Sequence, residues 1–119
     1  MMSKFVDLLE KEGSSPLFKP LEIGNKAISI QASFSHYCKP RETLKEHEWH
    51  CYDEWEIAIF SEKEWLHPSD DYFDNFDRQK DLCGRYENGK HPIGAYVPTG
   101  LIEDLILYIK ETEGVDDYE

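Results

Sequence analysis

Five side chains with metal-binding chemistry fall within sixteen residues of one another: His36, Cys38, His47, His50 and Cys51. Imidazole and thiolate groups are the usual zinc ligands, and zinc takes four ligands in tetrahedral geometry. The spacing matches no standard zinc pattern, and on a strand His50 and Cys51 would face opposite ways. We therefore expect no cofactor and interpret the cysteines as small core residues and the histidines as part of a hydrated loop. A zinc site stays an alternative.

A group of aspartates predicts an acidic recognition surface. If residues 69–82 form a helix, the aspartates at i, i+4, i+7 and i+11 make one stripe, with neighbours roughly 5–6 Å apart. That pitch approximates the spacing of phosphates along a nucleic-acid strand, so the stripe suits a basic surface of a partner protein. The alternatives are a solvated helix face and an acidic loop. The candidate partner-binding residues are Asp70, Asp71, Tyr72 (expected to be exposed), Asp74, Asp77 and Asp81.

The segment 36–42 is a candidate site for a small molecule or a nucleotide. It joins the two strongest predicted strands and contains Tyr37 and Arg41, one of the few arginines in the chain. An aromatic ring beside a guanidinium combines stacking with a two-pronged hydrogen bond to a phosphate. Tyr37, Arg41 and His36 are therefore the predicted ligand-binding residues. The other interpretation is a structural loop with an Arg–Glu surface pair.

The sequence contains none of the common enzyme motifs. Gly-x-Ser-x-Gly, the P-loop and Gly-x-Gly-x-x-Gly are all missing. Glu54 and Glu56 fall on one face of a predicted strand, about 7 Å apart, a separation at which carboxylates can serve acid–base chemistry. Because two glutamates on a strand face are more often simply solvated, we expect a protein that is not an enzyme.

Length and charge narrow the possible functions further. The chain has 119 residues, enough for one domain, and its 13 Lys and Arg against 25 Asp and Glu give a formal net charge of −12. This charge argues against direct binding of DNA or RNA and against adsorption to anionic membranes. It favours a partner with a basic surface, although solubility alone would also explain it.

The cysteines and the N-terminal segment predict a cytoplasmic setting. Cys38, Cys51 and Cys83 are odd in number and irregular in spacing, unlike a secreted disulfide framework. The first twelve residues are charged and lack the apolar run of a signal peptide. No apolar stretch approaches the roughly 18 residues that a membrane span needs.

The first half of the chain is expected to contain one helix and a hairpin. Ser3 is a plausible cap of a short helix that Gly13 ends. Residues 21–23 and the strand that follows Gly24-Asn25 predict a tight hairpin. In residues 28–34 apolar and polar side chains alternate, so Ile28, Ile30, Ala32 and Phe34 are expected to face the core.

A polar loop and a second strand are expected next. Residues 36–47 contain Pro40 and few apolar side chains, which is typical of a loop. Residues 49–60 predict a strand in which Trp55, Ile57 and Ile59 share the buried face.

The second half of the chain is expected to hold another hairpin and the longest helix. Phe73 and Phe76 should point inward from the aspartate segment. Residues 84–97 predict a hairpin with its turn at Asn88-Gly89, although Pro92 favours an edge strand or a late strand start. Thr99 is expected to cap a helix over 100–113, ended by Gly114.

The order of these elements predicts the fold class. A helix, several antiparallel strands and a closing helix make an α+β domain, with an antiparallel sheet of about four to six strands and both terminal helices packed on it. We expect one domain over residues 1–114 and an acidic C-terminal tail over 115–119.

Four short motifs resemble those of small bacteriophage and prophage proteins that have no assigned activity. They are Ser-Ile-Gln-Ala-Ser at 29–33, His-Tyr-Cys-Lys-Pro-Arg-Glu at 36–42, Trp-Glu-Ile-Ala-Ile-Phe at 55–60 and Gly-Ala-Tyr-Val-Pro at 94–98. That group pairs a Tyr-Cys-x-Pro-Arg turn with a late Gly-Tyr-Val-Pro, into which this chain inserts Ala95. The resemblance implies a phage-encoded protein of the bacterial cytoplasm. In that context small acidic proteins are often inhibitors of host or competitor machinery.

Together these features predict a small acidic binding protein without enzymatic activity. We expect a counter-defence inhibitor that covers a basic, nucleic-acid-binding surface of a partner protein. A small-molecule or nucleotide site in the 36–42 loop is the second hypothesis, and zinc binding is the third. We expect no direct contact with nucleic acid or membrane, and an exposed edge strand at the second hairpin would allow a homodimer.

Overall fold

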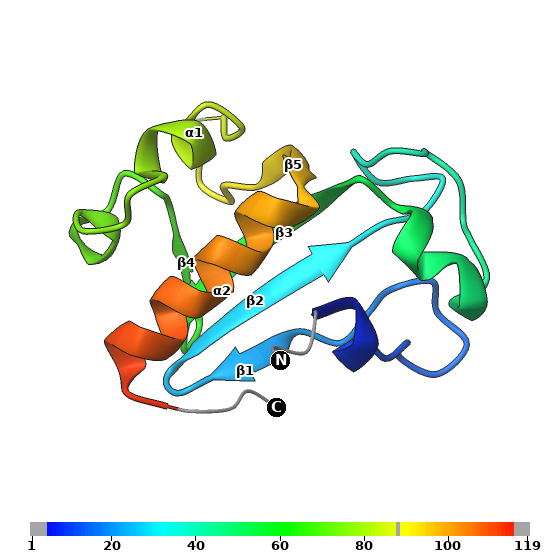
Figure 1. Cartoon of the computed structure of the whole chain (residues 1–119), viewed down its shortest axis with the longest axis horizontal. Coiled ribbons are helices and arrows are strands. Elements are labelled where there is room, and N and C mark those ends of the chain that lie inside the picture. Colours follow the sequence, from blue (N-terminus) through cyan, green and yellow to red (C-terminus); the bar gives the residue numbers. More distant parts are fainter. Residues whose placement is uncertain (1–4, 88, 116–119) are drawn as a thin grey trace.

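Three antiparallel strands, β1 (Leu21–Ile23), β2 (Lys26–Gln31) and β3 (Glu54–Ser61), form the centre of the computed structural model (Figure 1). The structure describes residues 5–87 and 89–115. β1 and β2 are the hairpin that the sequence predicts. Its turn contains a glycine at φ +60°, a backbone conformation that residues with a side chain rarely adopt.

The apolar face of the sheet follows from the pairing of β2 with β3. Ile28 lies opposite Ile59, and Ile30 lies opposite Ile57, so all four side chains project to one face and are buried. Trp55 joins them and has no exposed surface. The predicted inward face of β3 is therefore confirmed.

The second edge of β3 is shared by two short strands. β4 (Glu64–Leu66) pairs with residues 59–61, and β5 (Gly94–Pro98) pairs with residues 54–57 across an irregular register. The sheet thus has five strands, all antiparallel to their neighbours. The expected α+β class and strand number are confirmed.

One helix, α2 (Thr99–Glu113), covers the apolar face of the sheet, crossing in front of β3 and running alongside β2 (Figure 1). Its buried residues are Leu101, Ile102, Leu105, Ile106 and Ile109. Gly114 ends the helix in the left-handed conformation, as predicted. Within the described residues, no helix is long and apolar enough to cross a membrane.

Thr99 does not cap α2 in the predicted way. The helix begins at Thr99 itself, Pro98 is the N-cap residue, and no side chain caps the first turn. The Thr99 hydroxyl instead accepts a hydrogen bond of 3.0 Å from the indole N–H of Trp55. A buried indole needs an acceptor, and this need outweighs the capping preference of threonine.

The N-terminal helix is present but shorter than predicted. η1 (Phe5–Leu8) is a single 3-10 turn, and the expected cap Ser3 lies outside the described residues. Phe5 and Val6 are buried against the core. A segment this short cannot sustain an α-helix without tertiary contacts, and those contacts need only one turn.

The connection between β2 and β3 differs from the prediction at both ends. β2 stops at Gln31, so Phe34 is not on the core face but is 67% exposed. The predicted strand over 49–60 begins only at Glu54, because η2 (Glu46–Cys51) forms a 3-10 helix that buries Trp49. The polar loop predicted between the two strands is otherwise present.

The segment between β4 and β5 contains η3 (Asp71–Phe73) and α1 (Gln79–Cys83). The hairpin predicted over 84–97 is not formed as two strands. Among the described residues, the segment that precedes β5 joins it through an isolated bridge between Tyr86 and Gly94, and Asn88 lies outside those residues. A strand that starts after Pro92 fits the late start that proline imposes. The exposed edge strand expected at this hairpin is therefore limited to Gly94–Pro98.

Candidate binding surfaces

The aspartate segment 70–81 is not the predicted helix. Two short helical turns, η3 and α1, are separated by non-helical turns, so the carboxylates do not form a stripe at i, i+4, i+7 and i+11. Aspartate is a weak helix former, and like charges at helical spacing repel each other. Phe73 and Phe76 nevertheless point into the core, as predicted.

Two of the predicted aspartates are used inside the chain. The carboxylate of Asp70 accepts a hydrogen bond of 2.8 Å from the backbone N–H of His67, which closes a turn. Arg78 bridges Asp81 at 3.4 Å and Asp104 of α2 at 3.0 Å. These groups are partly exposed, so the ion pairs position the segment more than they stabilise it.

The other three predicted aspartates are available to a partner. Asp71, Asp74 and Asp77 are exposed, and their carboxylates contact no cation or hydrogen-bond donor among residues 5–87 and 89–115. Three neighbouring negative charges without internal compensation raise the local negative potential. They therefore add negative potential to the surface of this segment.

A shallow groove of about 450 Å³ lies between this segment and α2. Its lining combines apolar and aromatic side chains with three carboxylates, and Arg78 is the cation among the lining residues. Leu107 is 37% exposed there. The groove suits a long basic side chain, whose stem packs on apolar atoms while its charge meets carboxylates. The lining residues are Asn75, Phe76, Asp77, Arg78, Asp104, Leu107, Tyr108 and Glu111.

Tyr72 is not the exposed contact residue that we expected. It is half-buried, its hydroxyl donates a hydrogen bond of 2.8 Å to Glu113, and the ammonium of Lys26 lies 4.7 Å from its ring centre. Glu113 also forms an ion pair of 3.4 Å with Lys26 and accepts a hydrogen bond from the backbone N–H of Asn25. Tyr72 therefore fastens the aspartate segment to the end of α2 and to the β1–β2 turn.

The pKa values in this network follow from its contacts. Burial and the hydrogen bond to Glu113 raise the pKa of Tyr72 above its usual range. Burial alone would raise the pKa of Glu113, but the hydrogen bonds from Tyr72 and Asn25 and the charge of Lys26 outweigh it and lower that pKa. Glu113 is thus a charged anchor of the fold.

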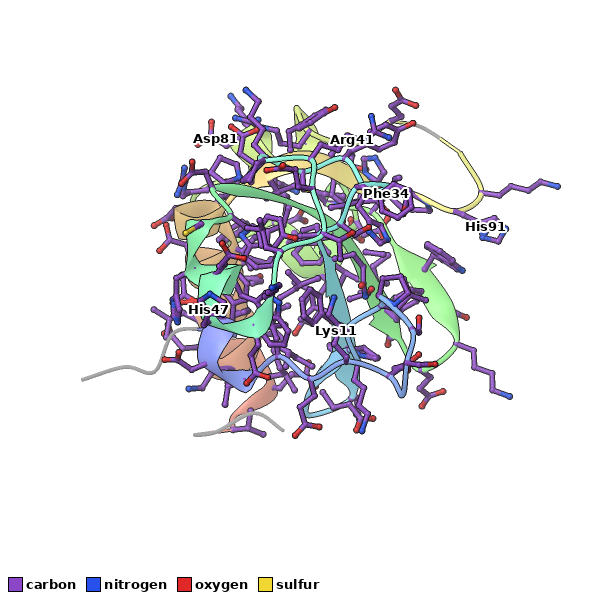
Figure 2. All side chains as sticks on the ribbon, turned by 90° about the vertical axis from the view of Figure 1, so that its right-hand side faces the viewer. Lys11, Phe34, Arg41, His47, Asp81 and His91 are labelled. Carbon is purple, nitrogen blue, oxygen red and sulfur yellow. The ribbon has the colours of Figure 1, made fainter. Side chains whose placement is uncertain are left out.

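The loop 33–43 brings two of the predicted ligand residues into contact. The guanidinium carbon of Arg41 lies 5.2 Å from the ring centre of Tyr37, a cation–π arrangement. The Nε of Arg41 donates a hydrogen bond of 3.2 Å to the carbonyl oxygen of Phe34. Figure 2 shows the side chains of Arg41 and Phe34 beside each other. Tyr37 is 44% exposed, so an aromatic and cationic surface faces solvent.

Hydrogen bonds within this loop and to neighbouring segments fix its backbone. The Phe34 N–H donates to the hydroxyl of Thr43 at 3.1 Å, and the Tyr37 N–H donates to the Glu56 carboxylate at 3.1 Å. The Tyr96 N–H donates to the carbonyl oxygen of Tyr37 at 3.0 Å. Glu56, which the sequence leaves as a solvated glutamate, is therefore an anchor of the loop.

Tyr96 and Arg85 belong to this surface although the sequence analysis does not identify them as ligand residues. The rings of Tyr37 and Tyr96 lie 5.9 Å apart, and Tyr96 adopts a left-handed conformation with φ 53°. Arg85 donates a hydrogen bond of 2.7 Å to the Tyr96 carbonyl oxygen. The only sequence signal was the 94–98 motif, which reveals nothing about this long-range contact.

His36 and Cys38 have structural roles in the same loop. The His36 Nδ1 lies 2.6 Å from the Ser33 hydroxyl, and partial burial lowers the pKa of His36 despite the opposing charge of Glu56. Cys38 is buried, and its thiol donates to the Ser33 carbonyl oxygen at 3.3 Å. Burial raises the pKa of the Cys38 thiol, which disfavours the thiolate that a metal requires.

The remaining predicted zinc ligands lie apart from that pair. His47 and Cys51 are exposed, and His50 pairs with Asp7 at 3.1 Å. Among the residues that the structure describes, no three His, Cys, Asp or Glu side chains are close enough to hold one metal ion. Closeness in sequence therefore does not become closeness of the ligand atoms.

Two surfaces therefore carry binding chemistry. We call Asp71, Asp74, Asp77, Asp104 and Glu111 the acidic face, and residues 33–43 the aromatic–arginine loop. No family model matches the chain, and no curated protein or solved structure matches it. Function is accordingly inferred from the geometry of these two surfaces.

Proposed function

We propose that the protein is a non-enzymatic binding protein whose acidic face covers a basic surface of a partner protein. The observation that supports this most directly is the group of exposed carboxylates of Asp71, Asp74 and Asp77, which have no partner in the described chain. Charges kept free in this way gain most from an external cation, because no internal pair has to be broken.

The charge of the whole chain favours the same partner. A formal net charge of −12 attracts a basic surface over a distance of about one Debye length, roughly 8 Å at physiological salt, and speeds encounter. Nucleic-acid-binding proteins present such surfaces, so a stoichiometric inhibitor of the counter-defence type is the form that we propose. The proposal therefore rests on charge complementarity, because the aspartates lack the regular, phosphate-like spacing that a helix over 69–82 would have given them.

The groove beside α2 would add selectivity to this attraction. Leu107 and Tyr108 offer apolar contact between the carboxylates of Asp104 and Glu111. A partner side chain with a long stem and a terminal charge would meet both kinds of surface. Arginine fits this description best, because its planar guanidinium binds carboxylates through two hydrogen bonds.

A hexa-arginine peptide is a defined probe for this proposal. We expect the D71N/D74N/D77N variant to bind it about tenfold more weakly than the wild type, as three screened charge contacts would produce. Wild-type binding should weaken strongly between about 50 and 500 mM salt. Fluorescence anisotropy of the labelled peptide measures both effects.

The matched control is E12Q/E42Q/E46Q, which changes three exposed glutamates outside the acidic face by the same total charge. We expect this control to bind the peptide within about twofold of the wild type, because screening limits the range of its charges. An equal loss in both variants would show that net charge alone acts, and the proposal would then be wrong.

A further inference from the structure

The acidic residues are distributed unevenly along the chain. The two longest stretches without Asp or Glu are 23–41 and 88–102, in a sequence that has 25 acidic residues among 119. They lie far apart in sequence, yet Tyr37 of the first and Tyr96 of the second are in contact. The fold therefore joins the two least acidic parts of the chain into one surface.

Cationic and aromatic groups lie side by side on that surface. The Arg41 guanidinium lies over the Tyr37 ring at 5.2 Å, Tyr37 lies 5.9 Å from Tyr96, and Arg85 is bound to the Tyr96 carbonyl oxygen at 2.7 Å. Phe34 extends this row on the Arg41 side and is 67% exposed. The order is aromatic, cation, aromatic, aromatic, cation.

Arg41 keeps hydrogen-bonding capacity that the chain does not use. Its Nε is bound to the Phe34 carbonyl oxygen, while neither terminal nitrogen has an acceptor among the described residues. Arg78 differs, because it is bound to two aspartates. The hydrogen bond fixes the Nε of Arg41, and the Tyr37 ring lies beside the guanidinium plane. The two terminal nitrogens of Arg41 are therefore positioned before any ligand binds.

From this arrangement we propose that the aromatic–arginine loop binds a nucleotide. The base stacks on the exposed ring of Phe34 or Tyr37, and the phosphate accepts two hydrogen bonds from the free nitrogens of Arg41. Arg85 and Lys39 add positive charge nearby. This site is separate from the acidic face and does not depend on its role.

The polar surroundings favour a nucleotide over an acidic segment of a protein. Hot spots of protein interfaces lie in dry, apolar surroundings from which lysine is depleted. Here Phe34 is flanked by Ser35 and Thr43, and Lys39 is exposed on the same loop. Rings interleaved with cations match a ligand that itself combines a flat base with a charged phosphate.

Titration with AMP, observed by ¹⁵N NMR, tests this proposal. We expect saturable binding below about 10 mM, with shifts at the amides of the loop, whereas adenosine and inorganic phosphate should each bind about tenfold more weakly. A parallel titration with hexathymidylate distinguishes a free nucleotide from one in a single strand. An affinity comparable to that for AMP indicates a free nucleotide, and a clearly higher affinity indicates an unpaired nucleotide of a strand.

Variants locate the site. R41Q should weaken AMP binding about tenfold, R41K should weaken it too because lysine lacks the planar fork, and F34A should remove the contribution of stacking. R78Q is the matched control and should bind AMP as the wild type does, since Arg78 is an arginine outside the loop. All three side chains are partly or fully exposed, so these four variants should fold.

Three results would overturn the proposal. One is no saturable binding of AMP, and another is binding that R41Q and F34A leave unchanged, since the nucleotide would then sit elsewhere. The third is hexaglutamate binding the loop more tightly than AMP does, because an acidic protein segment would then be the better occupant.

Discussion

The aromatic–arginine loop and the aspartate segment both connect regular elements, yet they are fastened in opposite ways. In residues 33–43 backbone groups bind within the loop and to β3 and β5, Cys38 is buried in the core, and the side chains of Phe34 and Arg41 lie at the surface. In residues 70–81 the side chains do the fastening, through buried Phe73 and Phe76 and through polar contacts.

This difference bears on how each region can function. A loop held by its backbone can exchange its exposed side chains with little effect on the fold, so its chemistry is free to serve a ligand. A segment that is held by its side chains has fewer side chains left to contact a partner. Of the five predicted aspartates, Asp71, Asp74 and Asp77 remain available, because Asp70 and Asp81 are bound internally.

The largest effect is expected where the aspartate segment is fastened to α2. Glu113→Ala removes the ion pair with Lys26 and the acceptors of Tyr72 and Asn25, and it should lower the free energy of unfolding by about 3 kcal/mol. Glu111→Ala is the matched control on the same helix. Because Glu111 is exposed, its loss should cost less than about 0.5 kcal/mol in denaturant titration.

The same anchor predicts a dependence of stability on pH. Because the folded state lowers the pKa of Glu113, its contribution is complete above the unfolded value of about 4.3 and is lost as pH falls through the folded pKa. The stability advantage of wild type over Glu113→Gln should therefore be constant above about pH 5 and shrink below about pH 4. An advantage that grows as pH falls would contradict this assignment.

A smaller effect is expected beneath the aromatic–arginine loop. A Cβ at Gly94 would lie 2.7 Å from the Tyr86 ring and 3.0 Å from Val97, so Gly94→Ala should destabilise the fold by about 2 kcal/mol. Gly100→Ala is the control, because its Cβ would meet nothing within 4 Å. Thermal unfolding should show a lowered Tm for the first variant and an unchanged or raised Tm for the second.

The smallest effect on stability is expected at the exposed end of the loop. Phe34→Ala should change the free energy of unfolding by less than about 0.5 kcal/mol, since a side chain that is 67% exposed buries little area on folding. A loss well above 1 kcal/mol in denaturant titration would mean that Phe34 is part of the core, and the contrast between the two regions would fail.

Local sequence patterns determined much of the framework. The β1–β2 hairpin, the inward row of Trp55, Ile57 and Ile59, and the long C-terminal helix follow from turn chemistry and from periods of two and 3.6 residues. These patterns are properties of a short stretch of chain, so they can be recognised without knowing its neighbours. The formal net charge of −12 is likewise a sum over the sequence.

Only the tertiary structure decided the composition of the two surfaces. Whether an aspartate is free depends on a cation or N–H brought from elsewhere, as Arg78 reaches Asp104 of α2. The contact of Tyr37 with Tyr96 exists because both residues lie near one end of β3, although their segments are far apart in sequence. Such contacts depend on how whole elements pack, and the pattern of residues around either partner does not reveal them.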